Sequence, residues 1–300
     1  MLFPHYTYRR MILSMLGRFG RSPGAVNQRL VAQNWKTYRQ FRSRQFVCNV
    51  CGCEGVPFFD FPDLKLRREH CIGTLRETLQ CKTCGATMRH RTVAAMLLGV
   101  LSQRIGRVLR SIREVDANAL EAFRILDTDA FSPISKRLRH LRGYYIGSFH
   151  PDLPFDTEIE HSHFNVNLEK MGFESSSFDI VLTSDVMEHV RDIDAAHREI
   201  SRILKAQGQY IFTVPYDGAL AGHRVLVDTS GDEDIFLVPP HYHGDPLTGG
   251  ILAYRIFGQQ IFNDLATLGL ATELSNINDS DALIIDGDAF IATRVASSPH

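Results

Sequence analysis

Several features are missing from this 300-residue sequence, and each absence excludes a class of protein. No run of about 18 apolar residues occurs, so we expect no segment to span a membrane as a helix. The short apolar stretch at 11–16 is followed by no small-residue cleavage site, which argues against a secretory leader. The formal net charge is −1, so no global field draws the chain towards nucleic acid. Internal repeats and low-complexity tracts are absent as well.

Acidic residues are missing from the beginning of the chain. Residues 1–46 contain nine lysines and arginines, and the first acid is Glu54. We predict a basic, poorly ordered arm over 1–46. Two alternatives stay open, an organellar transit peptide and upstream sequence added by a misjudged start codon.

Cysteine is confined to one short segment, because all six cysteines lie between residues 48 and 84. Without a secretory leader, a disulfide framework is not expected, and paired C-x-x-C spacing favours metal. The expected compartment is therefore reducing, and we predict a cytoplasmic protein.

Four of these cysteines form two pairs separated by 29 residues, and each pair is followed at once by a glycine. Two C-x-x-C turns offer four thiolates to a tetrahedral zinc ion, and glycine permits the open dihedral of such a turn. We predict a zinc-ribbon-like knuckle over 47–91 with one structural Zn²⁺. Cys53 and Cys71 are alternative ligands, and ordinary reduced cysteines or a redox pair are alternative interpretations. The predicted metal ligands are Cys48, Cys51, Cys81 and Cys84.

A basic cluster, Arg89-His90-Arg91, follows the knuckle. We interpret it as the solvated start of a helix, with gripping of an acidic partner as the alternative. Apolar residues then recur at spacings of three and four from Thr92 to Arg113, which predicts an amphipathic helix. This helix lies in a connecting segment over 92–121.

From residue 122 onward, short apolar runs alternate with helical patterns. This alternation predicts an α/β fold over 122–300, a parallel sheet with helices on both faces. Asp192 or Asp194 is the expected N-cap of the helix at 194–204, and Gly208 is expected to end it. The predicted strands are 123–127, 144–148, 164–168, 178–183, 210–214, 271–274 and 290–294, and the other predicted helices are 134–141 and 257–268.

The stretch from Phe178 to Val190 carries a family resemblance, which continues through Arg198 to Pro215. A strand beginning Phe-Asp, then Glu-His-Val, then a helix ending near Leu204-Lys205 resembles class I S-adenosylmethionine-dependent methyltransferases of the type 11 branch. The resemblance covers about residues 122–295 and is most specific over 178–215. It implies a Rossmann-like, doubly wound, mostly parallel sheet, here preceded by a small zinc ribbon, and S-adenosyl-L-methionine as cofactor.

In an open parallel sheet, ligands lie beyond the carboxyl ends of the strands. Four polar residues fall at such ends, and we expect them to bind the cofactor: Asp127, Ser148, Asn167 and Asp185. The chain departs from the family in its first turn, where Asp127 to Pro133 contains no glycine, and at the second strand, where Ser148 replaces the usual acid. Both a competent cofactor site and a degenerate one are therefore compatible with the sequence.

The long segment between Tyr216 and Tyr254 is expected to cover the carboxyl ends of the strands, because links of this kind are commonly about two to six residues long. We predict that its His243, with His189 as the second choice, faces the acceptor and assists deprotonation. The alternatives are that His243 only bonds to backbone in its own turn, and that Glu188 and His189 only cap a helix.

The predicted function is methyl transfer to an oxygen or nitrogen of a small-molecule or sugar acceptor, with no membrane span. The competing hypothesis is a non-catalytic zinc-ribbon interaction protein with a degenerate methyltransferase domain. Nucleic-acid methylation ranks last, because the chain has no aromatic–basic interleaving and no Asn-Pro-Pro-aromatic motif.

Overall fold

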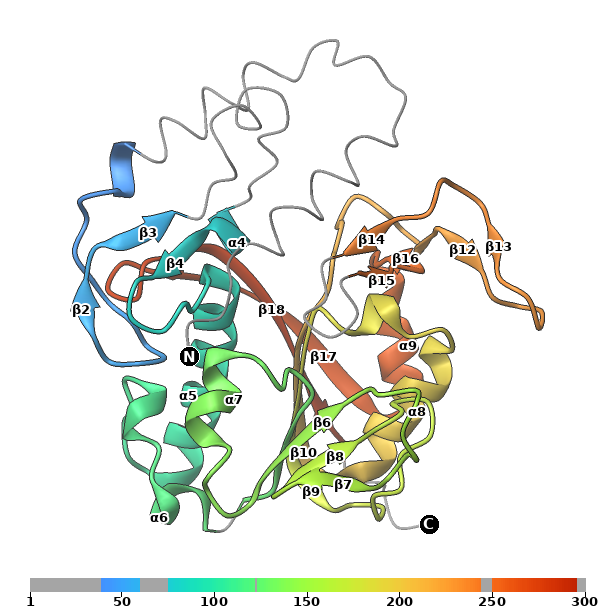
Figure 1. Cartoon of the computed structure of the whole chain (residues 1–300), viewed down its shortest axis with the longest axis horizontal. Coiled ribbons are helices and arrows are strands. Elements are labelled where there is room, and N and C mark those ends of the chain that lie inside the picture. Colours follow the sequence, from blue (N-terminus) through green and yellow to red (C-terminus); the bar gives the residue numbers. More distant parts are fainter. Residues whose placement is uncertain (1–38, 60–74, 122, 244–249, 296–300) are drawn as a thin grey trace.

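The computed structural model of this protein describes residues 39–59, 75–121, 123–243 and 250–295. The arm before residue 39 and Cys71 lie outside these ranges. One eight-stranded sheet, in the order β17-β18-β10-β9-β5-β6-β8-β7, forms its centre (Figure 1). The strands of this sheet are β5 (Ile125–Asp127), β6 (Tyr144–Ser148), β7 (Glu158–Glu160), β8 (His163–Asn165), β9 (Phe178–Ser184), β10 (Leu204–Thr213), β17 (Leu270–Asp279) and β18 (Ile284–Arg294).

The middle of the sheet is parallel. β5 pairs in parallel with β6 and with β9, and the chain passes through β6 and β8 before it crosses back to β9. This reversal creates a topological switch point between β5 and β9, where ligands bind in open α/β sheets. β9 and β10 are also parallel, whereas β7, β17 and β18 make antiparallel pairs. The predicted Rossmann-like, mostly parallel fold is confirmed.

Helices cover both faces of the sheet, as predicted (Figure 1). Alternate residues of β9 point to opposite faces, so that Ile180 and Leu182 join one apolar core and Val181 joins the other. α5 (Met88–Ile105) and α7 (Pro133–Leu138) contribute to the first core, and α8 (Ile193–Ile203) and α9 (Gln260–Thr267) to the second. Two short helices, η1 (Ile112–Glu114) and α6 (Ala117–Leu120), follow α5.

The boundaries of several elements differ from the prediction. Asp192 caps α8, as expected, but α8 ends at Ile203, and Gly208 lies inside β10. A register shift between Leu204 and Gln209 absorbs the irregular backbone there, so Gly208 marks a bulge and not a helix end. α5 begins at Met88 and ends at Ile105, where Gly106 adopts the left-handed conformation of a C-cap.

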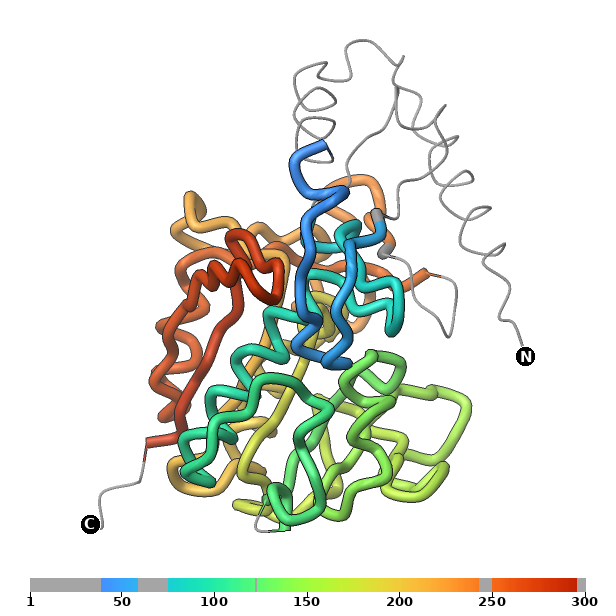
Figure 2. Tube along the Cα trace, turned by 90° about the vertical axis from the view of Figure 1, so that its left-hand side faces the viewer, coloured from blue at the N-terminus to red at the C-terminus, as the bar shows by residue number. Residues whose placement is uncertain are grey.

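The cysteine-bearing knuckle and the segment after β10 lie at the same end of the sheet (Figures 1 and 2). Among the described residues, no helix is long and apolar enough to cross a bilayer. The knuckle contains β1 (Phe46–Val47), β2 (Glu54–Gly55), β3 (Pro57–Phe59), α4 (Leu75–Thr78) and β4 (Leu79–Cys81). The segment after β10 forms three two-stranded pairs, of β11 (Arg224–Val225) with β16 (Arg255–Ile256), β12 (Val227–Asp228) with β13 (Ile235–Phe236), and β14 (Tyr242–His243) with β15 (Ile251–Leu252).

Candidate functional site

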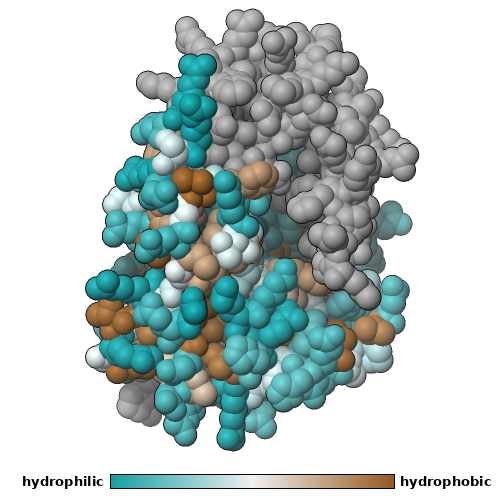
Figure 3. Space-filling view, turned by 60° about the vertical axis from the view of Figure 1, so that its left-hand side comes forward, coloured by the Kyte–Doolittle hydropathy of each residue, from teal (hydrophilic) through white to brown (hydrophobic). Residues whose placement is uncertain are grey.

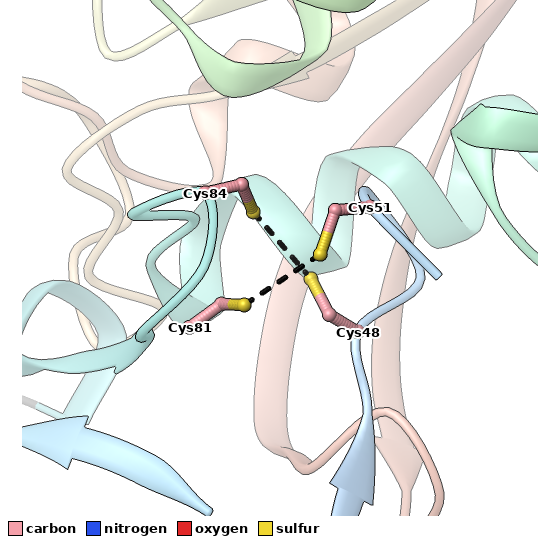
Figure 4. A group of neighbouring side chains, drawn as sticks. All are labelled: Cys48, Cys51, Cys81 and Cys84. Atoms are coloured by element: carbon pink, nitrogen blue, oxygen red, sulfur yellow. Dashed lines mark hydrogen bonds between the residues drawn. The ribbon is translucent and has the colours of Figure 1, made fainter. Parts of the chain in front are cut away.

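The four predicted metal ligands meet in one cluster, to which Cys48 and Cys51 come from one turn and Cys81 and Cys84 from another (Figure 4). Each turn closes with a bond from the glycine amide to the carbonyl of the first cysteine, of 2.7 Å in the first turn and 2.8 Å in the second. Both glycines adopt left-handed φ angles, 69° at Gly52 and 73° at Gly85, as the sequence predicted.

The cluster has the dimensions of a zinc site. The Sγ atoms of Cys48 and Cys84 are 3.8 Å apart, those of Cys51 and Cys81 are 3.7 Å apart, and all four lie within 4.8 Å of one another. Two sulfurs bound tetrahedrally at about 2.3 Å from zinc are separated by about 3.8 Å. Burial raises the pKa of the Cys51 thiol to about 12, whereas hydrogen bonds with Cys48 and Cys84 lower the pKa of Cys81. Four thiols at this spacing are compatible with Zn²⁺.

Arg91 joins this knuckle to the rest of the molecule. Its side chain is completely buried and donates to the carbonyls of Leu79 and Ala86 in the knuckle, at 3.1 and 2.8 Å. It also donates to Ala282 and Leu283, at the turn between β17 and β18, at 2.9 and 3.1 Å. The prediction of a solvated basic cluster is therefore wrong for Arg91, because its guanidinium faces the interior.

A second cluster fills the switch point between β5 and β9. At the end of β5, Asp127 is buried, accepts from the Asp129 amide at 2.9 Å, and accepts a short hydrogen bond from the Tyr144 hydroxyl. Burial, with the Asp129 charge nearby, raises the pKa of Asp127 to about 7. This carboxyl therefore changes its charge near neutral pH.

Asp185 lies directly after β9 and faces two arginines of the knuckle. Arg76 donates to both of its carboxylate oxygens, at 2.5 and 2.7 Å, and Arg89 Nε lies 3.4 Å from one of them. Thr213, at the end of β10, donates to the same carboxylate at 2.9 Å. Burial alone would raise the pKa of Asp185, but Arg76 and Arg89 hold it well below its usual range.

The backbone of Asp185 is strained, with a φ of 53° in the left-handed region. Residues other than glycine rarely adopt this conformation, and such strain gathers at functional sites. The ion pairs with the arginines and the bond from Thr213 hold the residue in place. Asp185 is thus held in a strained backbone conformation at the candidate site.

Arg89 and His90 extend this cluster to β5. Arg89 donates to Glu77 at 2.8 Å, makes a short hydrogen bond to the Ser184 hydroxyl, and lies 3.9 Å from Asp129. His90 Nε2 is 3.6 Å from the Asp129 carboxylate, while its Nδ1 accepts from the Thr87 amide at 3.1 Å. Burial alone would lower the pKa of Arg89. The carboxylates of Glu77, Asp185 and Asp129 outweigh this effect and raise the pKa above its usual value. The Arg89 side chain is 14% exposed, and those of Asp129 and Asp185 are about a fifth exposed, so this edge is partly open to solvent.

Ser148 lies at the end of β6 between two histidines. Its Oγ is 2.7 Å from His163 Nε2 and 2.9 Å from His150 Nε2. Buried Asn165, at the end of β8, shapes the next loop by accepting from the His150 amide and donating to the carbonyls of His150 and Leu153. The predicted Asn167 closes its own turn, because its side-chain oxygen accepts from the Glu169 amide at 2.9 Å.

The predicted catalytic histidines have different surroundings. His189 is mostly buried in η2 (Met187–His189), its Nδ1 is 2.7 Å from the Leu252 carbonyl, and its Nε2 is 3.7 Å from the carboxylate of fully buried Glu188. The backbone of His243 lies in β14, but its side chain lies outside what the structure describes. Neither role is tested, and both stay predictions.

The long segment after β10 contacts the residues that follow β9, as expected. Arg255 is buried and donates to the carbonyls of Met187 and Val190, at 3.2 and 2.6 Å. The Tyr254 amide donates to the Glu188 carbonyl at 2.8 Å. These bonds fix the segment at the carboxyl end of β9.

Sequence reasoning missed the arginines and histidines that surround the predicted site residues. Arg76 was not singled out, and Arg89 was interpreted as solvated or as gripping an acidic partner. Its partners are the acids Glu77, Asp129 and Asp185 of the same chain. The residues that the sequence did not assign to this site are Arg76, Arg89, His90, Asp129, His150, His163 and Thr213.

Comparison with known proteins gives one family match. Residues 154–212 match the family model described as a methyltransferase domain. No curated protein matches the sequence. Similar solved structures include S-adenosylmethionine-dependent methyltransferases from Methanosarcina mazei (17% identity, 58% of this chain and 93% of that chain, TM-score 0.36) and Mesorhizobium loti (18%, 61% and 99%, 0.37). A third is a putative enzyme of this kind from Listeria monocytogenes (13%, 58% and 92%, 0.38).

The family match confirms the resemblance to class I S-adenosylmethionine-dependent methyltransferases, and the cysteine cluster fits the zinc-ribbon segment predicted before it. The matched residues run from the loop after β6 to the end of β10 and include all of β9. The match supports methyl transfer from S-adenosylmethionine and leaves the acceptor undetermined.

Proposed function

We propose that this protein transfers a methyl group from S-adenosylmethionine to an oxygen or nitrogen of a small-molecule or sugar acceptor. The observation that carries the proposal is the charged, partly exposed edge between β5 and β9, in a chain whose residues 154–212 match a methyltransferase domain. The cofactor supplies an electrophilic methyl group on a sulfonium. The protein's part is to bind, to orient and to move a proton.

The residues at this edge fit the chemistry of the cofactor. Its amino-acid end carries a carboxylate and an ammonium group, which need a cation and an anion side by side. Arg89 and Arg76 provide the cations, and Asp185 and Asp129 provide the anions. A guanidinium binds a carboxylate through paired N–H donors, which a lysine cannot do.

The strand ends offer the remaining polar groups. Asp127 is the predicted partner of the cofactor at β5, and its pKa of about 7 lets it donate or accept a hydrogen bond. Ser148, with His150 and His163 beside it, would face the ribose, and Asn167 would offer its amide to the adenine. These assignments follow from position at the carboxyl ends of the strands.

The acceptor would lie under the segment between Tyr216 and Tyr254. Transfer to a hydroxyl is helped by a base, and histidine is suited to this role near neutral pH. His243 is the first choice, and His189 is the second because both of its ring nitrogens already face protein atoms. Once an acceptor is known, unchanged turnover in a His243→Ala enzyme would remove His243 from the mechanism.

Zn²⁺ in the knuckle has a structural role in this proposal, because four thiolates leave no open coordination position. Arg76 and Arg89 flank the second cysteine pair in the sequence, so the knuckle positions the two cations at the cofactor edge. The reduced cysteines of the knuckle also favour the cytoplasm as the location of this protein.

The second candidate is a non-catalytic interaction protein. The ion pair of Arg76 and Asp185 favours it, because the two side chains satisfy each other at the edge where a cofactor would bind. The glycine-free turn after β5 favours it as well. In this case the ion pair is a permanent structural link.

Calorimetric titration with S-adenosylmethionine separates the two candidates. The methyltransferase proposal expects stoichiometric binding that is weakened by Asp185→Ala and unchanged by Arg142→Ala, an exposed control before the amino end of β6, whereas the cofactor edge lies at the carboxyl ends of the strands. No heat and no thermal shift at millimolar cofactor would favour the non-catalytic protein. A normal affinity in Asp185→Ala would show that this residue is only a structural link.

A further inference from the structure

A cavity of about 550 Å³ lies between the knuckle, η1 and α7, outside the sheet edge described above. Three arginine or lysine side chains and one histidine line it: Arg113 from η1, Lys136 and Arg137 from α7, and His140 from the turn after α7. Thr83 and Cys84 of the knuckle form another wall. The volume falls within the range of small-molecule pockets, roughly 300 to 1,000 Å³.

The cations reach the cavity because of their spacing. Lys136, Arg137 and His140 follow Pro133 by three, four and seven residues, so all four lie on one side of α7 and of the turn that continues it. This side faces the knuckle and not the sheet. The opposite side of α7 carries Ile134 and Leu138, which are buried in the core.

Within the described parts of the chain, no carboxylate neutralises these cations. Arg113, Lys136, Arg137 and His140 form no ion pair with another described residue, and no acid lines the cavity. The nearest acid in sequence, Glu114, is engaged with the Ser111 hydroxyl and the Arg110 amide, both at 3.1 Å. Like charges around one cavity repel each other, and an anion between them removes this cost.

The floor of the cavity is apolar. Ile112, Val115 and Pro133 line it and are buried. The ligand that fits therefore has a strongly anionic group and an uncharged body. A phosphate monoester has three oxygens for charge-assisted hydrogen bonds with the cationic side chains, whereas a carboxylate has two.

We propose that this cavity binds a phosphorylated small molecule, with the phosphate held by Arg113, Lys136 and Arg137 and the body of the ligand against Ile112 and Val115. The volume of the cavity and the apolar side chains in its lining fit a small molecule. Hydrophilic side chains cover much of the molecular face that carries the knuckle and α6 (Figure 3). The site does not depend on methyl transfer.

The test uses the zinc-loaded full-length protein and two pairs of probes. Ribose 5-phosphate is compared with ribose, and inorganic pyrophosphate with acetate at equal ionic strength, by calorimetry. We expect one site per chain for ribose 5-phosphate and pyrophosphate, with ribose and acetate at least about tenfold weaker, the usual effect of losing one charge-assisted contact. We expect saturating S-adenosylhomocysteine to leave these affinities unchanged. The proposal for this site and the proposal for the cofactor site are therefore tested independently.

The variants locate the site. Lys136→Glu with Arg137→Glu lowers the affinity for ribose 5-phosphate by at least about tenfold, because two attractive charges become repulsive. The control Arg142→Glu changes an exposed arginine that does not line the cavity, and it keeps the wild-type affinity within about twofold. These side chains lie outside the core, so folding is retained, which circular dichroism verifies.

Three results would overturn the proposal. One is equal binding of ribose and ribose 5-phosphate, or no binding of either phosphate probe at about 10 mM. The second is an equal loss in Arg142→Glu, which would indicate a diffuse surface effect. The third is binding of an RNA oligonucleotide by a protein that binds neither small phosphate.

Discussion

Replacing Arg91 by methionine tests how the knuckle is attached to the sheet. The wild-type guanidinium is fully buried and holds four carbonyl groups, two in the knuckle and two between β17 and β18. Methionine fills part of the volume but donates nothing, so these carbonyls lose their charged donor. At a net contribution of about 1 kcal/mol for each bond, the loss is about 4 kcal/mol.

Two effects change this expected loss of stability in opposite directions. Burial lowers the pKa of Arg91 to about 10, which shows that the charge is costly here, and the removal of that charge relieves part of the loss. The thiolates of the cysteine cluster stabilise the Arg91 charge, so a dianionic zinc tetrathiolate loses a compensating cation. We therefore expect Arg91→Met to destabilise the fold by about 3 to 5 kcal/mol, as when a buried ion pair is broken.

The assay is thermal unfolding followed by circular dichroism, together with zinc release to a chelator. The expected decrease in Tm is about 10 °C, and zinc leaves at a lower chelator concentration than in the wild type. Arg110→Met is the matched control, because this arginine is exposed and it bonds to Glu114 through its backbone amide. An Arg91→Met protein with the Tm and zinc retention of Arg110→Met would refute this account of Arg91.

Three further predictions concern the knuckle and the first strand. Cys81→Ser should abolish stoichiometric zinc in elemental analysis and unfold the knuckle, while far-UV circular dichroism keeps most of the helical signal of the main domain; stoichiometric zinc in this variant would contradict the ligand set. Because φ is 73° at Gly85, Gly85→Ala should destabilise the knuckle by about 1 to 2 kcal/mol, measured as zinc release at a lower chelator concentration. Gly99 occupies an exposed position of α5 with open space around an added Cβ, so Gly99→Ala should stabilise the fold by up to about 1 kcal/mol. Asp127 has a pKa raised from 3.8 to about 7, so the folded state holds its proton more tightly, and stability decreases as pH rises from about 4 to about 7. Asp127→Asn should remove this slope from denaturant titrations across that range, and an unchanged slope would contradict the raised pKa.

The sequence predicted those elements whose pattern is local. Tyr144–Ser148 is a strand with the predicted bounds, and α8 and β9 lie within a residue of the prediction. The four clustered cysteines were predicted from spacing alone, because C-x-x-C geometry is contained in two short turns. Asp127 and Asp185 lie at the switch point, as strand order requires once the fold is known.

Features that depend on distant partners were not predicted. Arg76 and Asp185 are 109 positions apart, and no periodicity indicates that an arginine of the knuckle reaches the end of β9. Arg91 was interpreted as solvated because a basic run usually is, but the fold places its side chain against four backbone carbonyls. Gly208 was interpreted as a helix end, although its flanking residues pair with β9 and make it part of a bulged strand.

The most direct test of the central claim is calorimetric binding of S-adenosylhomocysteine to the zinc-loaded protein before and after Arg89→Gln. The claim is that the edge between β5 and β9, with the arginines of the knuckle, holds the cofactor. It predicts one site per chain in the wild type and an affinity at least about tenfold lower in the variant, the effect of losing one charge-assisted bond to a carboxylate. Equal affinity in the two proteins, or no binding to the wild type at millimolar concentration, would contradict it.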